Sequence, residues 1–276
     1  MNPVTLDEVL PVRTCHTVPQ APPATNAPGR CKDAQPGGEV GTLGDLLRLM
    51  GANPDDSTAL PVPLRRLRRG ESLLHEGAPA DAIYFVRGGT FKIFRTSEDG
   101  YEHVLGFACR AEVLGFDALC MDRQSTAVVA LEESSVYAVQ VNDLDALGRQ
   151  QPAFDHVLHL AASSALAQSI EQADLMAAVA AEVRLARFLV QWSQRMASRG
   201  LSPWRFHLRM SRRDIASHLG VAHETVSRSF STLVASGLLS VQYRDVQILA
   251  MDRLQRLSRN TRRHVDADAR GGPARS

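Results

Sequence analysis

The sequence lacks any apolar run long enough to cross a bilayer. Its longest apolar stretches, such as residues 159–167, are short and interrupted by polar residues, whereas a membrane-spanning helix needs about 20 mostly apolar residues. The N-terminus has neither the basic start nor the apolar segment of a targeting signal. We therefore expect a protein of the cytoplasm.

Cysteine is also scarce, which argues against a disulfide-stabilised fold. The four cysteines are widely and irregularly spaced: Cys15, Cys31, Cys109 and Cys120. Disulfide frameworks belong to small secreted domains that cannot build a sufficient core. Because this chain has 276 residues and is 44% hydrophobic, it is long enough for two ordinary domains. We expect its cysteines to be reduced thiols.

The chain as a whole has little net charge, only +1, but its two parts are strongly charged and of opposite sign. Residues 181–276 contain no lysine and carry 17 arginines against 7 acidic residues, a net charge of +10, while residues 1–180 carry a net charge of −9. A basic block suits a polyanionic partner, because phosphate neutralisation releases condensed counterions. An arginine-rich composition without a partner is the alternative, so motifs must decide.

The N-terminal half divides into an extension and a β domain. Residues 1–58 are rich in Pro, Ala and Gly, which predicts a flexible extension with at most one short helix, in "LGDLLRLM". Residues 59–150 contain short apolar runs separated by turn signals, which predicts an all-β roll. Period-two apolar residues flank Gly88-Gly89 and Asp99-Gly100, and we expect a hairpin at each.

Between Pro152 and Gly200 the sequence has no further proline or glycine. Its Ala, Leu, Gln and Glu content predicts two helices with a break near residues 177–181. We interpret residues 151–178 as a dimerisation helix, because an apolar stripe continues along it: Leu158, Ala162, Leu166 and Ile170. The alternative is that this stripe covers the β domain of the same chain.

Residues 179–252 predict a winged helix-turn-helix, followed by a tail at 253–276. Ser211 and Asp214 have the spacing of a capping box, and Gly220 occupies a helix C-terminus. A second helix is expected from about His223 to Ala235, followed by a hairpin around residues 243–245. The predicted fold class is therefore α+β: a β-roll, a long helix and a winged helix-turn-helix.

The second helix begins with "HETVSR", and its first turns enter the major groove in this motif. Helical spacing places Glu224, Ser227 and Arg228 on one face, with Val226 and Phe230 on the apolar side. The base-reading candidates are His223, Glu224, Ser227 and Arg228. The phosphate-contacting candidates are Ser211, Arg212, Arg213 and Thr225. An ordinary Glu-to-Arg pair on a helix surface is the alternative.

The stretch "MSRRDIASHLGVAHETVSRSFSTLVASGLL" resembles the DNA-binding domain of the CRP/FNR family of bacterial transcription regulators, and Glu224, Ser227 and Arg228 resemble its FNR branch. "LLHEGAPADAIYFVRGGTFKIF" and "AEVLGFDAL" are similar to the family's sensory β-roll. The resemblance covers roughly residues 60–255. It implies a homodimer that binds double-stranded DNA at palindromes with TTGAT-type half-sites about one helical turn apart. His223 departs from the apolar residue of the FNR branch, which leaves the outermost base open.

The resemblance also suggests what the β-roll senses. Cyclic AMP binding in the family uses a Glu and an Arg-Ser pair, but this chain has Phe116 and Gln124 there, with Arg123 one residue out of register. Iron-sulfur clusters in the FNR branch use closely spaced cysteines, which Cys15 and Cys31 are not. We expect neither cofactor. An oxygen- or redox-responsive regulator that uses its cysteines is the alternative.

The turn in "RTSEDGYEH" matches a loop that touches RNA polymerase in FNR-type activators. The candidate contact residues are Thr96, Ser97, Gly100 and Tyr101, and the alternative is a solvated turn. A regulatory module attached to an enzyme is a different class of function, but the chain has no room for a catalytic domain. We therefore expect a regulator and not an enzyme.

Overall fold

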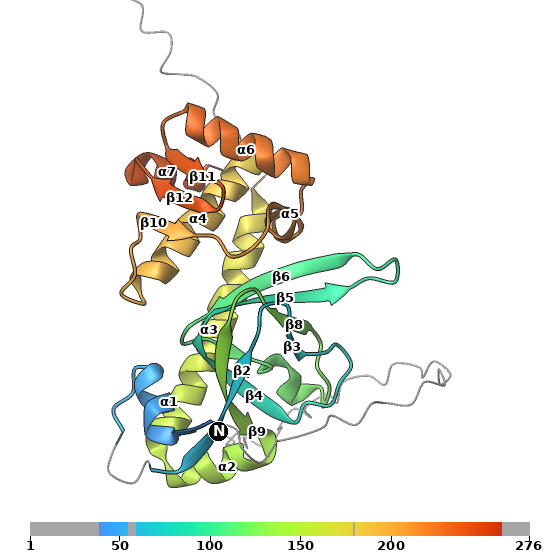
Figure 1. Ribbon diagram of the computed structural model, residues 1–276, viewed down its shortest axis with the longest axis vertical. Helices are drawn as coiled ribbons and strands as arrows, with labels where there is room; N and C mark the ends of the chain where they lie inside the picture. The colour runs from blue at the N-terminus through green and yellow to red at the C-terminus, as the bar shows by residue number, and fades with distance from the viewer. Residues whose placement is uncertain (1–38, 55–58, 179, 261–276) are drawn as a thin grey trace, which may run out of the picture. The chain divides into compact units, whose positions relative to one another are not determined.

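Two antiparallel sheets form the N-terminal half of the folded chain (Figure 1). The computed structural model describes residues 39–54, 59–178 and 180–260, all of which lie in one unit, Gly37–Ser276. One sheet has the order β1-β2-β9-β4-β7 and the other β3-β8-β5-β6. The strands are β1 (Val40–Thr42), β2 (Pro61–Leu67), β3 (Ser72–Leu74), β4 (Ala82–Gly88), β5 (Thr90–Thr96), β6 (Glu102–Cys109), β7 (Val113–Leu114), β8 (Ala127–Ala130) and β9 (Ser134–Gln140).

The two sheets share an apolar core, as the period-two pattern predicts. Val86 of β4 and Val136 of β9 lie in one cluster with Phe91 of β5 and Val128 of β8. Each of these side chains is buried. The expected β-roll is confirmed.

The prediction of a hairpin at Gly88-Gly89 is wrong. β4 pairs with β9 and β7, whereas β5 pairs with β6 and β8, so the chain passes between sheets at Gly89. Two strands that face one core from opposite sheets have the same period-two pattern as a hairpin. The hairpin around Asp99-Gly100 does form, between β5 and β6.

The crossing requires glycine at position 89. Its φ is 93°, and a Cβ there would lie 2.1 Å from Ser134 Oγ. Gly89→Ala is therefore expected to lower the unfolding free energy by about 2–5 kcal/mol, about 1–2 from the left-handed backbone and the rest from overpacking. Gly77→Ala is the matched control: φ is 79° but no atom lies within 4 Å, so only the backbone cost remains. Urea midpoints of the two variants measure the difference, and equal midpoints would contradict the packing argument.

Part of the expected flexible extension is folded. α1 (Leu43–Leu49) starts with a capping box between Thr42 and Asp45 and buries Leu43, Leu46 and Leu47 in the β-roll core. Most of the expected extension lies outside the described residues. α2 (Val141–Gln150), at the end of the expected β-roll, was not predicted, although Val141, Leu144 and Leu147 recur at helical spacing and pack against the β-roll core.

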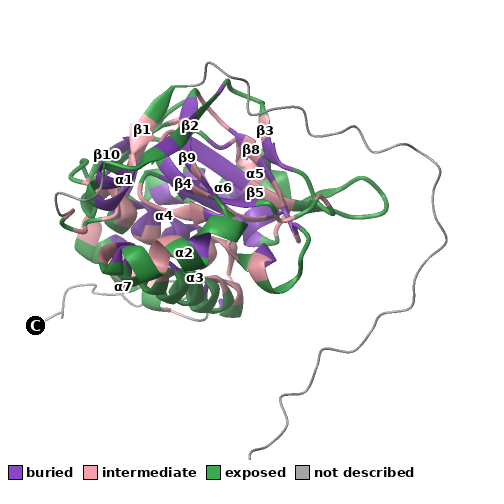
Figure 2. Cartoon of the chain, turned by 90° about the horizontal axis from the view of Figure 1, so that it is seen from below, coloured by how far each residue is buried: buried purple, intermediate pink, exposed green. Residues whose placement is uncertain are grey.

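The break expected near residues 177–181 is confirmed. α3 (Pro152–Ala177) has proline in its first turn, and α4 (Ala181–Ala197) follows it. The start of α3 packs Phe154 and Val157 into the β-roll core. Further along, Leu166 is 66% exposed and Ile170 is 63% exposed, and Figure 2 colours most of α3 as exposed. Among the described residues, no helix is both long and apolar enough to span a membrane.

The C-terminal elements are β10 (Arg205–His207), α5 (Arg212–Leu219), α6 (His223–Ala235), β11 (Leu239–Gln242), β12 (Asp245–Ile248) and α7 (Met251–Arg259). Their sheet has the order β10-β12-β11. The helix-turn-helix and the β11–β12 hairpin form as predicted. β10 and α7 were not predicted. α7 extends into the tail that was expected from residue 253, because Leu254 is fully buried in the core.

Candidate nucleic-acid interface

Local chemistry fixes both ends of α5. Ser211 Oγ accepts a hydrogen bond from the Asp214 backbone N–H at 3.1 Å, and Asp214 Oδ2 accepts one from the Ser211 N–H at 2.8 Å. Gly220 ends the helix with φ 62° and ψ 40°, a left-handed conformation that suits glycine. The predicted capping box and turn are confirmed, and they set the angle at which α6 follows.

α6 has one buried face and one exposed face. Val226 and Phe230 are buried in a cluster with Ile215 and Leu219 of α5. The exposed face holds the base-reading candidates His223, Glu224, Ser227 and Arg228. The structure therefore brings these four residues together on one surface, and the separation of core and exposed side chains agrees with the helical spacing.

Glu224 and Arg228 are free to meet a ligand. Within the described residues, neither side chain makes a hydrogen bond or an ion pair, so the intrahelical pair considered as an alternative is not formed. The Ser227 hydroxyl donates to the His223 carbonyl oxygen at 3.3 Å. The Arg228 guanidinium, a donor, and the Glu224 carboxylate, an acceptor, are therefore both available on the exposed face of α6.

The four residues predicted to contact DNA phosphates differ in how exposed and how free their side chains are. Arg213 is exposed, and its side chain has no hydrogen-bonding or ionic partner among the described residues, while Thr225 is half-buried. The Ser211 hydroxyl is engaged by Asp214. Arg212 points inward: its guanidinium carbon lies 3.4 Å from the Phe230 ring centroid, and Nη2 donates to the Tyr243 carbonyl oxygen at 3.4 Å. Burial, helped by the charge of Arg244, lowers the pKa of Arg212 to about 10.

The wing is the β11–β12 hairpin, and its turn consists of Tyr243 and Arg244. Tyr243 is 98% exposed and has a φ of 54°. Arg244 Nη1 donates to the Arg209 carbonyl oxygen at 3.0 Å. A cleft of about 560 Å³ lies between the wing turn and the start of the helix-turn-helix, and its lining residues are Met210, Ser211, Arg212, Arg213, His223, Tyr243 and Arg244.

α5 is attached to the edge strand of the β-roll. Ser217 Oγ accepts from the Val104 N–H at 2.9 Å and donates to the Glu102 carbonyl oxygen at 2.8 Å. These two groups belong to β6, the last strand of its sheet. Lys92 of β5 pairs with Glu102 and lies 3.4 Å from Asp214. The capping box of α5 is therefore also an ionic contact of the β-roll.

A second contact joins the β6–β7 turn to the end of α4. Glu112 accepts hydrogen bonds from Arg195 Nε and Nη2 at 3.1 and 3.0 Å and also pairs with Arg199. Neither this contact nor that of Ser217 is predictable from the sequence, because the partners are more than 80 residues apart and leave no local pattern.

His218 of α5 predicts a pH-dependent stability. Its ring centroid lies 5.3 Å from that of Phe107 and 5.7 Å from that of Phe188, and burial lowers its pKa from 6.5 to about 4. As pH falls, the unfolded chain therefore takes up the proton first. We expect this contribution to the unfolding free energy to be complete above pH 6.5 and to be lost between pH 6.5 and about 4, at up to about 1.4 kcal/mol per pH unit.

Urea titrations at several pH values check this prediction against His218→Phe, which keeps an aromatic ring at the site. The variant should lack this part of the pH dependence. Equal slopes for the wild type and the variant would contradict the assignment to His218.

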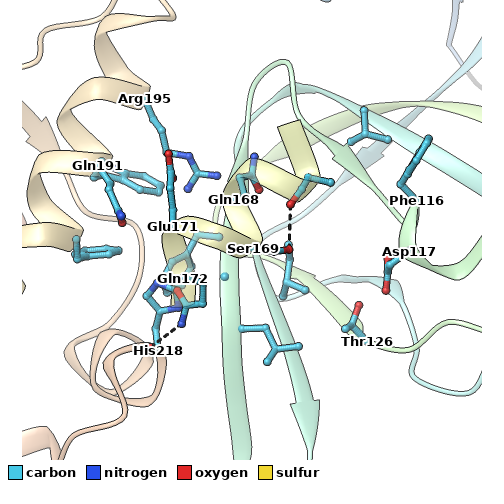
Figure 3. Close-up of a pocket in the computed structure, with 18 residues that line it drawn as sticks. Phe116, Asp117, Thr126, Gln168, Ser169, Glu171, Gln172, Gln191, Arg195 and His218 are labelled. Carbon is cyan, nitrogen blue, oxygen red and sulfur yellow. Dashed lines mark hydrogen bonds between the residues drawn. The ribbon is translucent and has the colours of Figure 1, made fainter. Parts of the chain in front are cut away.

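A second cleft, of about 400 Å³, lies between the β-roll and α3 and α4 (Figure 3). Phe116, Asp117 and Thr126 line it from the β-roll. Arg123, which is one residue out of register with the arginine that the family resemblance implies, donates to the Gly77 carbonyl oxygen at 2.8 Å. The one guanidinium among the lining residues belongs to Arg195, which is paired with Glu112. This arrangement does not fit the phosphate of a cyclic nucleotide.

The two described cysteines lie in different environments. Cys109 is buried in β6, and burial raises the pKa of its thiol to about 11. Cys120 is exposed at the end of a 3-10 helix, η1 (Asp117–Cys120). Cys15 and Cys31 lie outside the described residues. Within the described ranges, no group of three or more His, Cys, Asp or Glu side chains could hold a metal ion.

The β5–β6 turn carries the polymerase-contact candidates. Thr96, Ser97, Gly100 and Tyr101 are all exposed. The Ser97 N–H donates to the Tyr101 carbonyl oxygen at 2.9 Å, and Gly100 has a φ of 80°. The turn is thus a closed, hydrogen-bonded loop that presents the Tyr101 ring to solvent.

Comparisons with known proteins agree with this architecture. The Crp-like helix-turn-helix domain matches residues 183–257, and the cyclic nucleotide-binding domain matches residues 64–151. The chain is 34% identical over 222 residues to the transcriptional activator protein anr of Pseudomonas aeruginosa, covering 79% of this chain and 88% of that protein. It is 32% identical over 196 residues to the fumarate and nitrate reduction regulatory protein of Escherichia coli, covering 71% of this chain and 78% of that protein.

The fold is likewise similar to a solved structure, FixK2 from Bradyrhizobium japonicum. The TM-score is 0.64 at 25% identity, over 72% of this chain and 98% of that one. Since the matched domains include both the β-roll and the helix-turn-helix, the family resemblance extends beyond the DNA-binding motif. The chain belongs to the CRP/FNR family of transcription regulators, which bind DNA through the helix-turn-helix and are not enzymes.

Proposed function

We propose that this regulator binds palindromes with TTGAT-type half-sites as a homodimer. The observation that carries the proposal is the outer face of α6, where Glu224 and Arg228 are exposed and make no ionic or hydrogen-bonding contact among the described residues. Free charged groups on a recognition helix are available for base edges without first breaking an internal pair.

Each reading residue has a role that its chemistry supports. Arg228 donates two hydrogen bonds to the O6 and N7 of the half-site guanine. Glu224 accepts from the N4 amine of a cytosine on the opposite strand and helps to orient the guanidinium of Arg228. Ser227 contacts a thymine or adenine edge, and His223 reads the outermost base. Arg213 and Thr225 contact phosphates beside them, with Ser211 supporting the start of α5.

Dimerisation through α3 supplies the second recognition helix, which binds the second half-site of the palindrome. Leu158, at the start of the predicted stripe, packs partly against the core of its own chain, whereas Leu166 and Ile170 remain exposed. Self-coverage therefore accounts only for the start of the stripe, and a second copy of α3 would cover the rest. We assign sensing to residues 59–150, dimerisation to 151–178, and DNA binding to 179–252 together with α7.

We further propose that the protein activates transcription in the cytoplasm through a contact with RNA polymerase. The exposed turn of Thr96, Ser97, Gly100 and Tyr101 is the candidate surface. The relative from P. aeruginosa is named an activator. Because Tyr101 is a large side chain that the fold leaves 53% exposed, it is the residue of this turn best suited to a protein contact.

A second candidate is an oxygen- or redox-responsive regulator. The exposed thiol of Cys120 and the similarity to the fumarate and nitrate reduction regulatory protein favour it. The described residues do not fit an iron-sulfur cluster by themselves, because they supply two thiols and the Cys109 thiol is buried in β6. A visible absorption spectrum of anaerobically purified protein tests for a cluster. A charge-transfer band would indicate an iron-sulfur cluster, and a colourless protein would contradict one.

The test of the main proposal is a binding titration with two duplexes of equal length and composition, one with a TTGAT palindrome and one scrambled. We expect the palindrome to bind at least 1,000-fold more tightly at physiological salt, the lower end for specific regulators. Equal affinities would overturn the proposed sequence preference.

A further inference from the structure

The C-terminal ends of three helices receive hydrogen bonds from the first turns of α4. The last four backbone carbonyls of a helix have no partner within it, and they carry the negative end of the helix dipole. α3 ends at Ala177, α5 at Leu219 and α7 at Arg259. Two arginines of α4, Arg184 and Arg187, donate to carbonyl oxygens at all three ends. One pair of side chains therefore joins helices that are distant in the sequence.

Arg187 joins the end of α3 to the end of α7, which lies beside α4 (Figure 1). Its Nε donates to the Ser258 carbonyl oxygen at 2.7 Å, and its Nη2 donates to the Asn260 carbonyl oxygen at 3.3 Å. Its Nη1 donates to the Asp174 carbonyl oxygen and lies 3.1 Å from the Asp174 carboxylate. Among the described residues, Arg187 is the only buried arginine, at 8% exposed. All three guanidinium nitrogens are engaged, and together they bridge two helix ends.

Arg184 makes a similar bridge from α3 to the helix-turn-helix. Its Nη2 donates to the Met176 carbonyl oxygen at 3.4 Å and its Nε to the Ala178 carbonyl oxygen at 2.8 Å. Its Nη1 donates to the Leu219 carbonyl oxygen at 2.8 Å, at the end of α5. The two arginines thus tie α3 to both α5 and α7.

These bonds span the break between α3 and α4. Ala178 and Ala180 have extended backbones, with ψ of 135° and 133°, so the helical hydrogen-bond ladder is interrupted there. Under the proposed function, α3 holds two copies together and α6 reads the DNA. The break therefore lies between the dimer contact and the reading face, and rotation at the break would move α6 without changing its own contacts.

We propose that Arg187 is a positioning residue for DNA binding, which fixes the angle between the dimerisation helix and the recognition helix by bridging α3 and α7. The inference rests on the proposed homodimer and deepens it. Arginine suits the role because its planar fork donates in several directions, whereas a lysine ammonium is a point charge on a flexible stem. Two half-sites can be bound together only if both recognition helices are held about one turn of DNA apart.

The first measurement compares the palindrome with a duplex of equal length in which one half-site is scrambled. Arg187→Lys and Arg187→Met should each lower the ratio of the two affinities about 10-fold, within the range of about 5- to 150-fold typical of coupling between sites. Because lysine keeps the charge, a wild-type ratio in Arg187→Lys would overturn the bridge. Arg256→Met is the matched control: it removes an exposed arginine of α7 that has no ionic or hydrogen-bonding partner among the described residues, and it should keep the ratio.

The second measurement needs no DNA. Proteolysis of a transiently opened segment follows the population of its open form, and residues 177–181 are small enough for elastase to cleave between them. Cleavage there, mapped by mass spectrometry, should be about 10-fold faster in both Arg187 variants if the same coupling is lost. A general loss of stability would instead accelerate cleavage throughout residues 59–260 by one common factor, and urea midpoints measure that loss separately.

Unchanged cleavage at residues 177–181 in both variants would overturn the bridge. Faster cleavage with an unchanged affinity ratio would overturn the positioning role. If Arg187→Met does not fold, as its urea titration would show, Arg187→Lys decides both measurements. Failure of the proposed function looks different, because the wild type would then show no preference for the palindrome over the fully scrambled duplex, while the cleavage rates would still report on Arg187.

Discussion

Replacing Arg228 with alanine is expected to weaken binding to the TTGAT palindrome by about 2–6 kcal/mol, or about 30-fold to more than 10,000-fold. A bidentate contact to guanine discriminates by about 1–3 kcal/mol, and a dimer loses two of them. The expected loss lies near the upper end of this range. The Arg228 side chain makes no ionic contact within the described residues, so no contact has to be broken when it binds DNA.

Glu224→Ala should act on the same contact. If Glu224 orients the guanidinium as well as accepting from cytosine, the effects of the two substitutions overlap. The double variant should then lose less than the sum of the single losses, because the residues share one contact network. Additive losses would instead assign Glu224 and Arg228 to independent bases.

The measurement is the ratio of affinities for the palindrome and the scrambled duplex. Arg228→Ala should lower this ratio by about 30-fold or more, because the lost guanine contacts are made on the palindrome alone. The matched control is Arg253→Ala, which removes an exposed arginine from α7 and should keep the ratio while changing the overall charge equally. An unchanged ratio in Arg228→Ala would show that sequence is read elsewhere.

The features predicted from the sequence are those encoded by neighbouring residues. Ser211 with Asp214, and Gly220 after α5, determine the helix ends through contacts within four residues, so the helix-turn-helix could be located accurately. The break between α3 and α4 and the buried face of α6 follow in the same way from composition and helical spacing. For this reason the sequence alone predicts that the reading residues share one face of α6.

The features missed depend on partners distant in sequence. The period-two pattern around Gly88-Gly89 indicates burial but not which sheet a strand joins, so it predicts a hairpin where the chain crosses between sheets. β10 has three residues and exists through its pairing with β12. Arg212 turns inward because Phe230 and the Tyr243 carbonyl lie beside it, and nothing in "MSRRD" indicates either partner.

The second large effect concerns α3. Leu166→Asp and Ile170→Asp are each expected to convert the protein from dimer to monomer at micromolar concentration. These side chains are four residues apart on one helix face, and they are 66% and 63% exposed. Burial of a leucine or isoleucine is worth about 1.5–3 kcal/mol, and a two-fold interface counts each residue twice. The dimer dissociation constant should therefore rise at least 100-fold. The introduced carboxylate should raise it further, because burying an unpaired charge costs additional free energy.

Sedimentation equilibrium measures the association, and the palindrome titration measures its consequence. Leu201→Asp is the matched control: it places the same charge on a leucine that is 56% exposed outside α3, and it should leave the dimer intact. If Leu166→Asp stays dimeric, α3 is not the interface. If it becomes monomeric yet keeps the wild-type affinity for the palindrome, each half-site is bound independently. The expected combination, a monomer that binds the palindrome no better than a single half-site, would show that the exposed stripe on α3 is what couples two recognition helices to one DNA site.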